Sequence, residues 1–175
     1  MKPLESTALL LLGISSVVAF TAAPRAPLIA PAPPVAATAP APRPVLALHA
    51  ALANERRSAA LYEATARRHP EVLLFALLRD AETVHVGRVL DLFVRYDLEV
   101  PPNPEDPEKI PVPARVAAAC AAGADNERAT ITLFDGLIGE VNSVDVRETF
   151  SALRDASRDR HLPALERCAM RRGAP

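Results

Sequence analysis

The sequence predicts an all-α protein, in which an antiparallel four-helix bundle follows an N-terminal leader and a linker. The 175 residues include 50% hydrophobic but only 4% aromatic side chains, with no Trp and few glycines, a composition that favours helices over sheets. Apolar residues recur at spacings of three and four along four segments, which is the period of one helix face. Most of the 18 prolines lie outside those segments.

Residues 1–19 are predicted to be a signal or targeting leader. Lys2 precedes an uncharged run over residues 6–20, which is typical of a signal peptide and is short for a membrane span of about 20 residues. Small residues at Val17 and Ala19 predict cleavage before Phe20. Phe20 and the residues after it resemble the bipartite plastid-targeting leaders of algae; plain secretion and an uncleaved membrane anchor are the alternatives. We therefore expect an extracytoplasmic protein, either secreted or plastid-targeted.

Residues 20–44 are predicted to be a disordered linker rich in Pro and Ala. Eight prolines fall between Pro24 and Pro44, and proline lacks the N–H group that helices and sheets use. The remaining domain, residues 45–172, carries 17 basic and 20 acidic side chains, a net charge of −3. This charge gives no reason to expect a nucleic-acid partner, because binding phosphates needs a basic excess.

The first two helices form the first predicted hairpin. One covers residues 45–68 and ends at His69 and Pro70, and its inward residues are Leu48, Leu52, Glu55, Ala59, Tyr62 and Ala66. The other covers residues 71–96, and its inward residues are Phe75, Leu78, Glu82, His85, Val89, Leu92 and Tyr96.

Five prolines between Pro101 and Pro111 then require a loop before the second hairpin. Pro113 fits the first turn of a third helix that ends near Val141, with the inward residues Val116, Cys120, Gly123, Glu127, Phe134 and Val141. Asp145 is the expected N-cap of a fourth helix that ends near Met170, with the inward residues Val146, Phe150, Leu153, Ser157, His161 and Cys168.

The two hairpins resemble each other in sequence. At an offset of 72, NER and LYE at residues 54–56 and 61–63 recur as NER and LFD at residues 126–128 and 133–135. The tetrapeptide LRDA at 78–81, with His85 four places on, recurs at 153–156, with His161 five places on. We interpret this as a duplicated helical hairpin, for which an antiparallel four-helix bundle is the natural architecture.

Polar residues occupy five positions on the predicted buried faces, namely Glu55, Glu82, His85, Glu127 and His161. Burying an isolated carboxylate is strongly unfavourable, so each needs a hydrogen bond or an opposite charge. A metal cation supplies that charge, and we therefore predict these five residues as metal ligands. The alternative is a hydrogen-bonded polar cluster, derived from an ancestral site, that is now only structural.

The spacing of these residues resembles a carboxylate-bridged metal site. Glu82 and His85 stand three apart on one helix, so both can face the same ion. Bundles of the ferritin type use one Glu from each of two helices and a Glu-x-x-His pair from each of the other two. The sequence supplies five of these six ligands in helix order. The Glu of the second Glu-x-x-His pair is missing, because Arg158 stands three before His161 and Ser157 aligns with Glu82. The sixth position is filled by water, by a shifted Asp155 or Asp159, or not at all, and a nearby Arg that replaces a cation is a further alternative.

Several short motifs also carry a family resemblance, namely Glu55 with Tyr62 and Glu63, Glu82-Thr83-Val84-His85, Gly123 four before Glu127, and Ala156-Ser157 before His161-Leu162-Pro163-Ala164. The block from about residue 46 to residue 168 resembles the ferritin-like superfamily and, within it, the family labelled domain of unknown function 2202. The resemblance implies a ferritin-like bundle with the same five ligands. It implies no established activity, and it also implies that the acidic partner of the last His tends to be missing.

Such a centre indicates redox chemistry at iron, with manganese as the alternative metal and dioxygen or peroxide as oxidant. We expect Glu82 and Glu127 to bridge or chelate, Glu55 to be terminal, and each His to bind one ion. The expected function is a metal-dependent, ferroxidase-like oxidase or a peroxide-handling or oxygen-handling protein. The alternative is a non-catalytic bundle with a structural or degenerate metal site that serves as an interaction module. A membrane partner is expected only through an uncleaved leader, and a homodimer is compatible with the sequence.

The two cysteines are placed symmetrically about the predicted ligands. Cys120 lies seven residues before Glu127, and Cys168 lies seven residues after His161. On antiparallel neighbours these displacements point to the same end, so we hypothesise a disulfide, with two free buried thiols as the alternative. Tyr62 and Phe134 are expected to be core aromatics, and the two other histidines, His49 and His69, are expected to be cap or surface residues.

Overall fold

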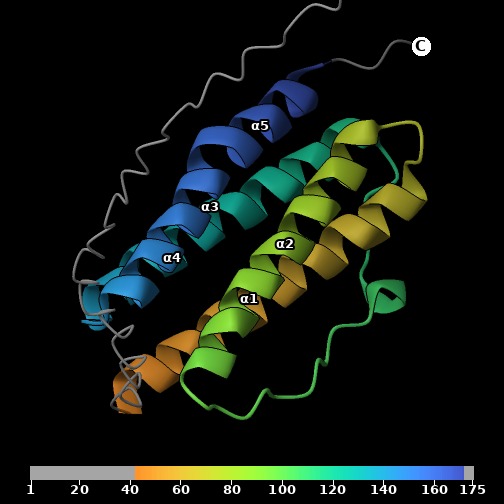
Figure 1. Cartoon of the computed structure of the whole chain (residues 1–175). Helices are drawn as coiled ribbons and strands as arrows, with labels where there is room; N and C mark the ends of the chain where they lie inside the picture. The colour runs from red at the N-terminus through yellow and green to blue at the C-terminus, as the bar shows by residue number, and fades with distance from the viewer. Residues whose placement is uncertain (1–41, 172–175) are drawn as a thin grey trace, which may run out of the picture. The chain divides into compact units, whose positions relative to one another are not determined.

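The computed structural model describes residues 42–171, and within this range the chain forms helices and contains no β-strand. The predicted leader and residues 20–41 of the predicted linker lie outside the described residues. Four long helical rods are present (Figure 1): α1 (Pro42–Arg68), α2 (Leu73–Arg95), α3 (Val116–Glu140), and a last rod made of α4 (Val144–Ala156), the π-helical turn η2 (Ser157–His161) and α5 (Leu162–Met170). None of the helices in the described part is long and apolar enough to cross a membrane.

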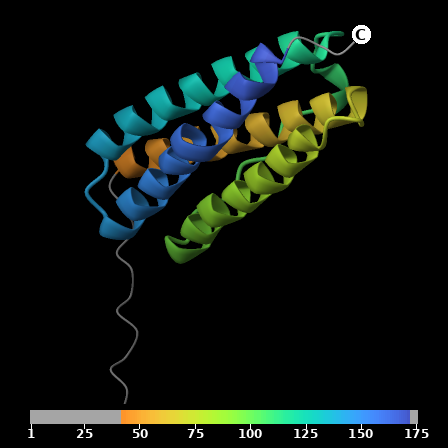
Figure 2. The ribbon, with the colours of Figure 1, turned by 90° about the horizontal axis from the view of Figure 1, so that it is seen from above.

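The helices form two antiparallel hairpins that pack against each other. α1 packs along α2, α3 packs along α4 and α5, and α1 also contacts α3. A crossover containing the short 3₁₀ helix η1 (Pro107–Lys109) runs back along the molecule, so that α2 and α3 point in the same direction (Figures 1 and 2). Arg56 of α1 holds the start of this crossover, because its guanidinium donates to the carbonyl of Pro101 at 2.8 Å. The structure thus confirms the predicted all-helical bundle.

The starts of three helices differ from the prediction. α1 begins at Pro42, three residues before the predicted start, since proline suits the first turn of a helix. α2 begins two residues later than predicted, at Leu73. α3 begins at Val116 and not at Pro113, whose carbonyl accepts a hydrogen bond from Nε2 of His69 at 2.9 Å. His69 directly follows the last residue of α1 and is buried, so of the predicted cap and surface roles the surface role is wrong.

The prediction of Asp145 as an N-cap is also wrong. Ser143 occupies the N-cap position of α4, and its side chain makes no capping hydrogen bond. Asp145 lies in the first turn, where Oδ1 accepts from the hydroxyl of Tyr96 at 2.7 Å and Oδ2 lies 3.1 Å from the guanidinium of Arg95. An acid in the first turn interacts favourably with the helix dipole, and these contacts tie the start of α4 to the end of α2.

The apolar core has two parts, with the polar residues between them along the helices. One part contains Leu48, Leu52, Val89, Phe134, Phe150 and Leu153, among others. The other contains Tyr62, Phe75, Leu78, Ala119, Cys120, Ala124 and Leu165. On α1, for example, Glu55 falls between Leu52 of the first part and Tyr62 of the second. The core therefore shields the polar residues from both ends of the bundle.

Equivalent contacts recur in the two hairpins at the offsets of the sequence repeat. Asn54 donates to Thr130 at 3.1 Å, and Asn126 donates to Ser58 at 3.0 Å. The two donors lie at an offset of 72 residues in the chain, and so do the two acceptors. The pair Glu63–Arg79, at 3.3 Å, has its counterpart in Asp135–Arg154, at 3.1 Å. The repeat therefore extends from the sequence to the contacts between side chains.

The π-helical turn η2 accounts for the one irregularity of the repeat. In this turn the N–H of Leu162 bonds to the carbonyl of Ser157, five residues back, so the helix holds one more residue than an α-helical turn would. Before the turn, the buried Phe150 corresponds to the buried Phe75 of the first hairpin, 75 residues earlier in the chain. After the turn, the buried Leu165 corresponds to the buried Val89, 76 residues earlier. The extra residue explains why the second His follows its LRDA tetrapeptide by five places.

A disulfide joins the helices α3 and α5 of the second hairpin. Cys120 and Cys168 are bonded, with their Cα atoms 5.8 Å apart and a sequence separation of 48 residues. The separation of the Cα atoms is within the range usual for disulfides. The hypothesis of a disulfide is thus confirmed.

Candidate metal centre

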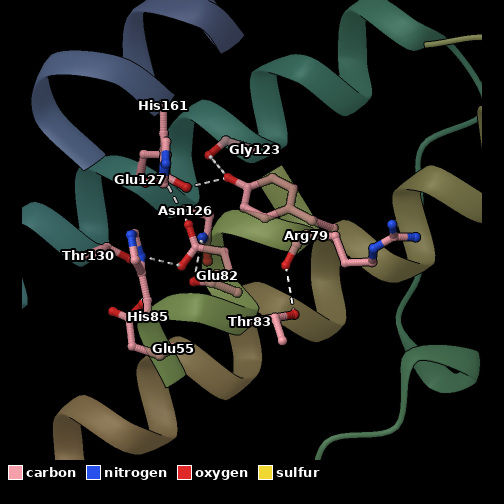
Figure 3. A network of polar contacts seen from close by, with 12 residues as sticks. Glu55, Arg79, Glu82, Thr83, His85, Gly123, Asn126, Glu127, Thr130 and His161 are labelled. Atoms are coloured by element: carbon pink, nitrogen blue, oxygen red, sulfur yellow. Dashed lines mark hydrogen bonds and ion pairs between the residues drawn. The ribbon is translucent and has the colours of Figure 1, made fainter. Parts of the chain in front are cut away.

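All five predicted ligands lie in one buried cluster in the middle of the bundle. Figure 3 shows their side chains converging from different helices. They come from α1, α2, α3 and the end of η2, and they are Glu55, Glu82, His85, Glu127 and His161. Each carboxylate residue is 1% exposed, and the two histidines are 4% and 6% exposed. The periodicity of the sequence therefore placed these residues on the correct faces.

The cluster divides into two groups that share Glu82. In the first group, Nδ1 of His85 lies 3.2 Å from Oε2 of Glu55 and 3.2 Å from Oε2 of Glu82. In the second, Nδ1 of His161 lies 3.0 Å from Oε1 of Glu82 and 3.5 Å from Oε2 of Glu127. The ligand atoms of each group lie within 4.8 Å of one another, so each group could hold one metal ion.

Unpartnered polar atoms mark the interior of this cluster. Among the described residues, the buried side-chain atoms without a hydrogen-bond partner are Glu55 Oε2, Glu82 Oε1, Glu127 Oε2 and His161 Nδ1. All four belong to the two groups. A buried polar atom without a hydrogen bond is unfavourable and rare in proteins. The concentration of four such atoms at one place is compatible with a site that could bind a cation.

The outer oxygens of the two flanking carboxylates are held by the protein. Asn54 donates to Oε1 of Glu55 at 3.3 Å, and the hydroxyl of Tyr62 donates to Oε1 of Glu127. In each case Oε2 is left facing the centre. The prediction of Tyr62 as a core aromatic is correct as to burial but omitted this bond. Phe134, the counterpart of Tyr62 in the second hairpin, is also buried. It has no hydroxyl and therefore cannot donate such a bond to a carboxylate of the site.

The protonation of the cluster compensates its charges in the absence of metal. Burial opposes the charge on His85 and His161, but the neighbouring carboxylates outweigh it and raise the pKa of each imidazole to about 9. Burial, together with the repulsion from Glu82, raises the pKa of Glu55 to about 8. Burial also opposes the charge on Glu82, yet its contacts with both imidazoles lower its pKa to about 2. The protons on the two imidazoles and on Glu55 thus balance the negative charge of the cluster, as a cation would.

The two aspartates that were alternatives for the sixth ligand are not in the site. Asp155 pairs with Arg154 at 2.9 Å, and Asp159 pairs with Arg158 at 2.8 Å, all at the surface of the rod. The expectation that either acid shifts inward, or that an Arg enters the site, is therefore wrong for these residues. Ser157 occupies the position instead and is buried.

The remaining histidine, His49, is outside the centre. Its ring lies edge-on to that of Phe93, with 5.1 Å between the ring centroids. The side chain is half-buried. Asn54, in contrast, is a site residue that the sequence reasoning missed, although its position directly before Glu55 in the repeated NER triplet was a usable signal.

Comparison of the chain with protein-family models, with curated proteins and with solved structures gave no significant match.

The metal-free bundle is expected to lose stability as the pH rises from 6.5 to 9. Each imidazole has a pKa near 9 in the fold against 6.5 for an ordinary His, so its stabilisation is complete below pH 6.5 and is lost as the pH rises through 9. Glu55, with a pKa raised to about 8, adds to the loss in the same direction. We expect Tm, measured by circular dichroism with a chelator present, to fall on the order of 10 °C.

A double variant tests the origin of this pH dependence. His85→Gln/His161→Gln removes both raised imidazoles and should flatten the slope of Tm between pH 6.5 and 9. A Tm of the unmodified chain that is constant over this interval would contradict the expected protonation of the cluster.

Proposed function

We propose that this protein is a ferritin-like metal-binding protein that holds two ions, iron or manganese, between its hairpins. One observation carries the proposal: each unpartnered buried side-chain atom of the described residues lies in one of two ligand groups. The groups share Glu82, which contributes one oxygen to each. This is the arrangement expected of a carboxylate that bridges two cations.

The type and order of the residues support the choice of metal and of family. Carboxylate and imidazole ligands suit iron and manganese. Ferritin-type bundles have one long crossover and take ligands from all four helices. This chain has one long crossover, and its candidate ligands come from all four helical rods. The contacts that repeat between the hairpins support an origin by duplication.

Each group has a defined role in the proposed centre. Glu55 is the terminal ligand of the first ion, with His85, and Glu127 binds the second, with His161. Tyr62 and Asn54 keep the outer oxygens of Glu127 and Glu55 occupied, so that the inner ones face the ions. Such outer hydrogen bonds orient metal ligands and tune their basicity.

We propose that the centre acts as a ferroxidase-like oxidase or in handling peroxide or oxygen. Iron or manganese in this setting supplies redox chemistry toward dioxygen or peroxide. Ser157 stands where a sixth ligand is expected, so each group offers three protein ligands and leaves room for an oxidant. The packed core on both sides of the centre excludes bulk water from it.

The same substitution favours a second candidate function. Because Ser157 stands where a sixth carboxylate is expected, the centre is one ligand short of the ferritin type. This ligand set is expected of a bundle with a structural or degenerate metal site that serves as an interaction module.

The disulfide supports an extracytoplasmic location, since such bonds persist in oxidising compartments.

Anaerobic loading with Fe(II) tests the function. We expect two irons per chain by metal analysis, and an increase in near-ultraviolet absorption when oxygen is added to the loaded protein. Two irons that do not react with oxygen would support the non-catalytic module, and a single iron would indicate a mononuclear or structural site. If no Fe(II) or Mn(II) is retained, the proposal of a metal centre fails.

A further inference from the structure

A surface pocket lies at the end of the bundle where the disulfide joins α3 to α5. Its volume is about 1060 Å³, and it is formed by the starts of α2 and α3 and by α5. Its apolar wall consists of Val72, Leu73, Leu74, Val116, Ala117 and Ala164. The metal ligands do not line it, so the pocket is separate from the proposed centre. A pocket of this size accommodates a small molecule.

The pocket carries an excess of positive charge. Arg115, Arg167 and Arg171 line it, against a single acidic residue, Glu71. Within the described residues, Arg115 and Arg167 take part in none of the ion pairs. Guanidinium groups bind carboxylates through paired hydrogen bonds, so the pocket is suited to an anionic ligand.

The disulfide is reachable from this pocket through one of its two cysteines. Cys168 lines the pocket and is half-buried, whereas Cys120 is completely buried. A disulfide is opened by a thiolate that attacks one of its sulfur atoms. The geometry therefore directs an incoming thiolate to Sγ of Cys168 and makes Cys120 the leaving group.

We propose that the pocket binds a small anionic thiol, of the size of a tripeptide with two carboxylates, which exchanges with the disulfide at Cys168. The arginines bind the carboxylates and raise the local concentration of the thiol. Positive charge nearby also favours the thiolate, which is the reactive form. The apolar wall accommodates the carbon chain of the ligand.

The exchange balances in two steps. The thiolate attacks Sγ of Cys168, a new S–S bond forms there, the bond to Cys120 breaks, and the Cys120 thiolate takes up a proton. A second thiolate then attacks the sulfur of the bound ligand and releases the ligand as its own disulfide, which leaves Cys168 as a thiolate that takes up a proton. Two small thiols are thus oxidised, and the Cys120–Cys168 bond is reduced.

Exchange at this bond acts on the helix that carries a metal ligand. Cys168 follows His161 by seven residues on the same continuous rod. In α5 the fully buried side chain is that of Leu165, and Glu166 pairs with Arg128 of α3 at 2.7 Å, so the disulfide is one of several attachments of this end to α3. Opening it would loosen α5 without changing the metal ligands themselves.

The rate of opening tests the proposal on the full oxidised chain without added metal. Glutathione is the anionic probe, and 2-mercaptoethanol is the neutral one, with rates compared per thiolate. We expect glutathione to react on the order of tenfold faster, an advantage that disappears at high salt. Mass spectrometry after alkylation should find the first glutathione adduct on Cys168 and a free thiol at Cys120.

Variants of the arginines separate binding from general reactivity. Arg115→Gln/Arg167→Gln should slow glutathione on the order of tenfold and leave the rate with 2-mercaptoethanol unchanged. Arg57→Gln, an exposed arginine outside the pocket, is the matched control and should change neither rate. Equal rates for the two thiols, a first adduct on Cys120, or no reaction with glutathione would each overturn the proposal. None of these results depends on whether the metal centre exists.

Discussion

Replacing Glu82 with Gln is expected to abolish the binding of both metal ions. Its Oε2 belongs to the group of Glu55 and His85, and its Oε1 belongs to the group of Glu127 and His161. An amide keeps the shape of the side chain but removes the negative charge from both positions. Loss of a supporting residue near a metal site costs about 10-fold to 100-fold in affinity, so we expect the loss of a shared ligand to exceed that range.

The two flanking carboxylates should behave differently from Glu82. Glu55→Gln is expected to remove only the first ion, and Glu127→Gln only the second, because each belongs to a single group. Calorimetric titration with Mn(II), together with metal analysis, should therefore count no ions for the Glu82 variant and one ion for each of the others.

The control for this series is a carboxylate outside the centre. Glu63 pairs with Arg67 and Arg79 near the surface of the first hairpin, so Glu63→Gln should leave both ions bound. Circular dichroism of each metal-free variant shows whether the bundle still folds. A Glu82→Gln protein that is folded and still binds one ion tightly would refute the shared ligand, and with it the two-ion arrangement.

The sequence was sufficient to predict the helices and the five central residues because both depend on local periodicity. A polar residue such as Glu82 at an inward position between Leu78 and Val89 is visible without any knowledge of the partner helices. The helix faces proved correct, since all the inward positions predicted for α2 are buried. The same reasoning placed Cys120 and Cys168 at one end of the bundle.

Features that depend on how the helices approach one another were not predictable. The bond from Asn54 to Thr130 joins residues 76 apart in the chain, and that from Tyr62 to Glu127 joins residues 65 apart. Neither pairing follows from a period along one helix.

Local end signals were also unreliable where a tertiary contact competed with them. Pro113 suits a first helical turn, but its carbonyl bonds to His69 instead. Asp145 suits an N-cap, but it bonds to Tyr96 from within the first turn. The π-helical turn was predictable only in part. Its signal, a one-residue stagger of the repeat, was present in the sequence, whereas its geometry required the structure.

Removing the disulfide is expected to destabilise the bundle by about 4 kcal/mol, because the bond closes a loop with a sequence separation of 48 residues and restricts the unfolded chain. For a domain of this size the fall in Tm is on the order of 10–20 °C. Thermal and urea unfolding should be measured on the reduced chain and on Cys120→Ala/Cys168→Ala. Agreement between the two would show that the effect comes from the loss of the cross-link and not from a change in packing at Cys120.

The effect of the disulfide should also be uneven across the molecule. α5 is short and has Leu165 as its one buried residue, so its amide hydrogens should exchange first when the bond is absent. His161 lies at the start of that segment, whereas His85 lies on α2, far from the cross-link in the chain. We therefore expect reduction to weaken the ion of the Glu127 group more than the ion of the Glu55 group. Equal weakening of both ions, or an unchanged Tm, would mean that packing against α3 holds the last rod without the disulfide.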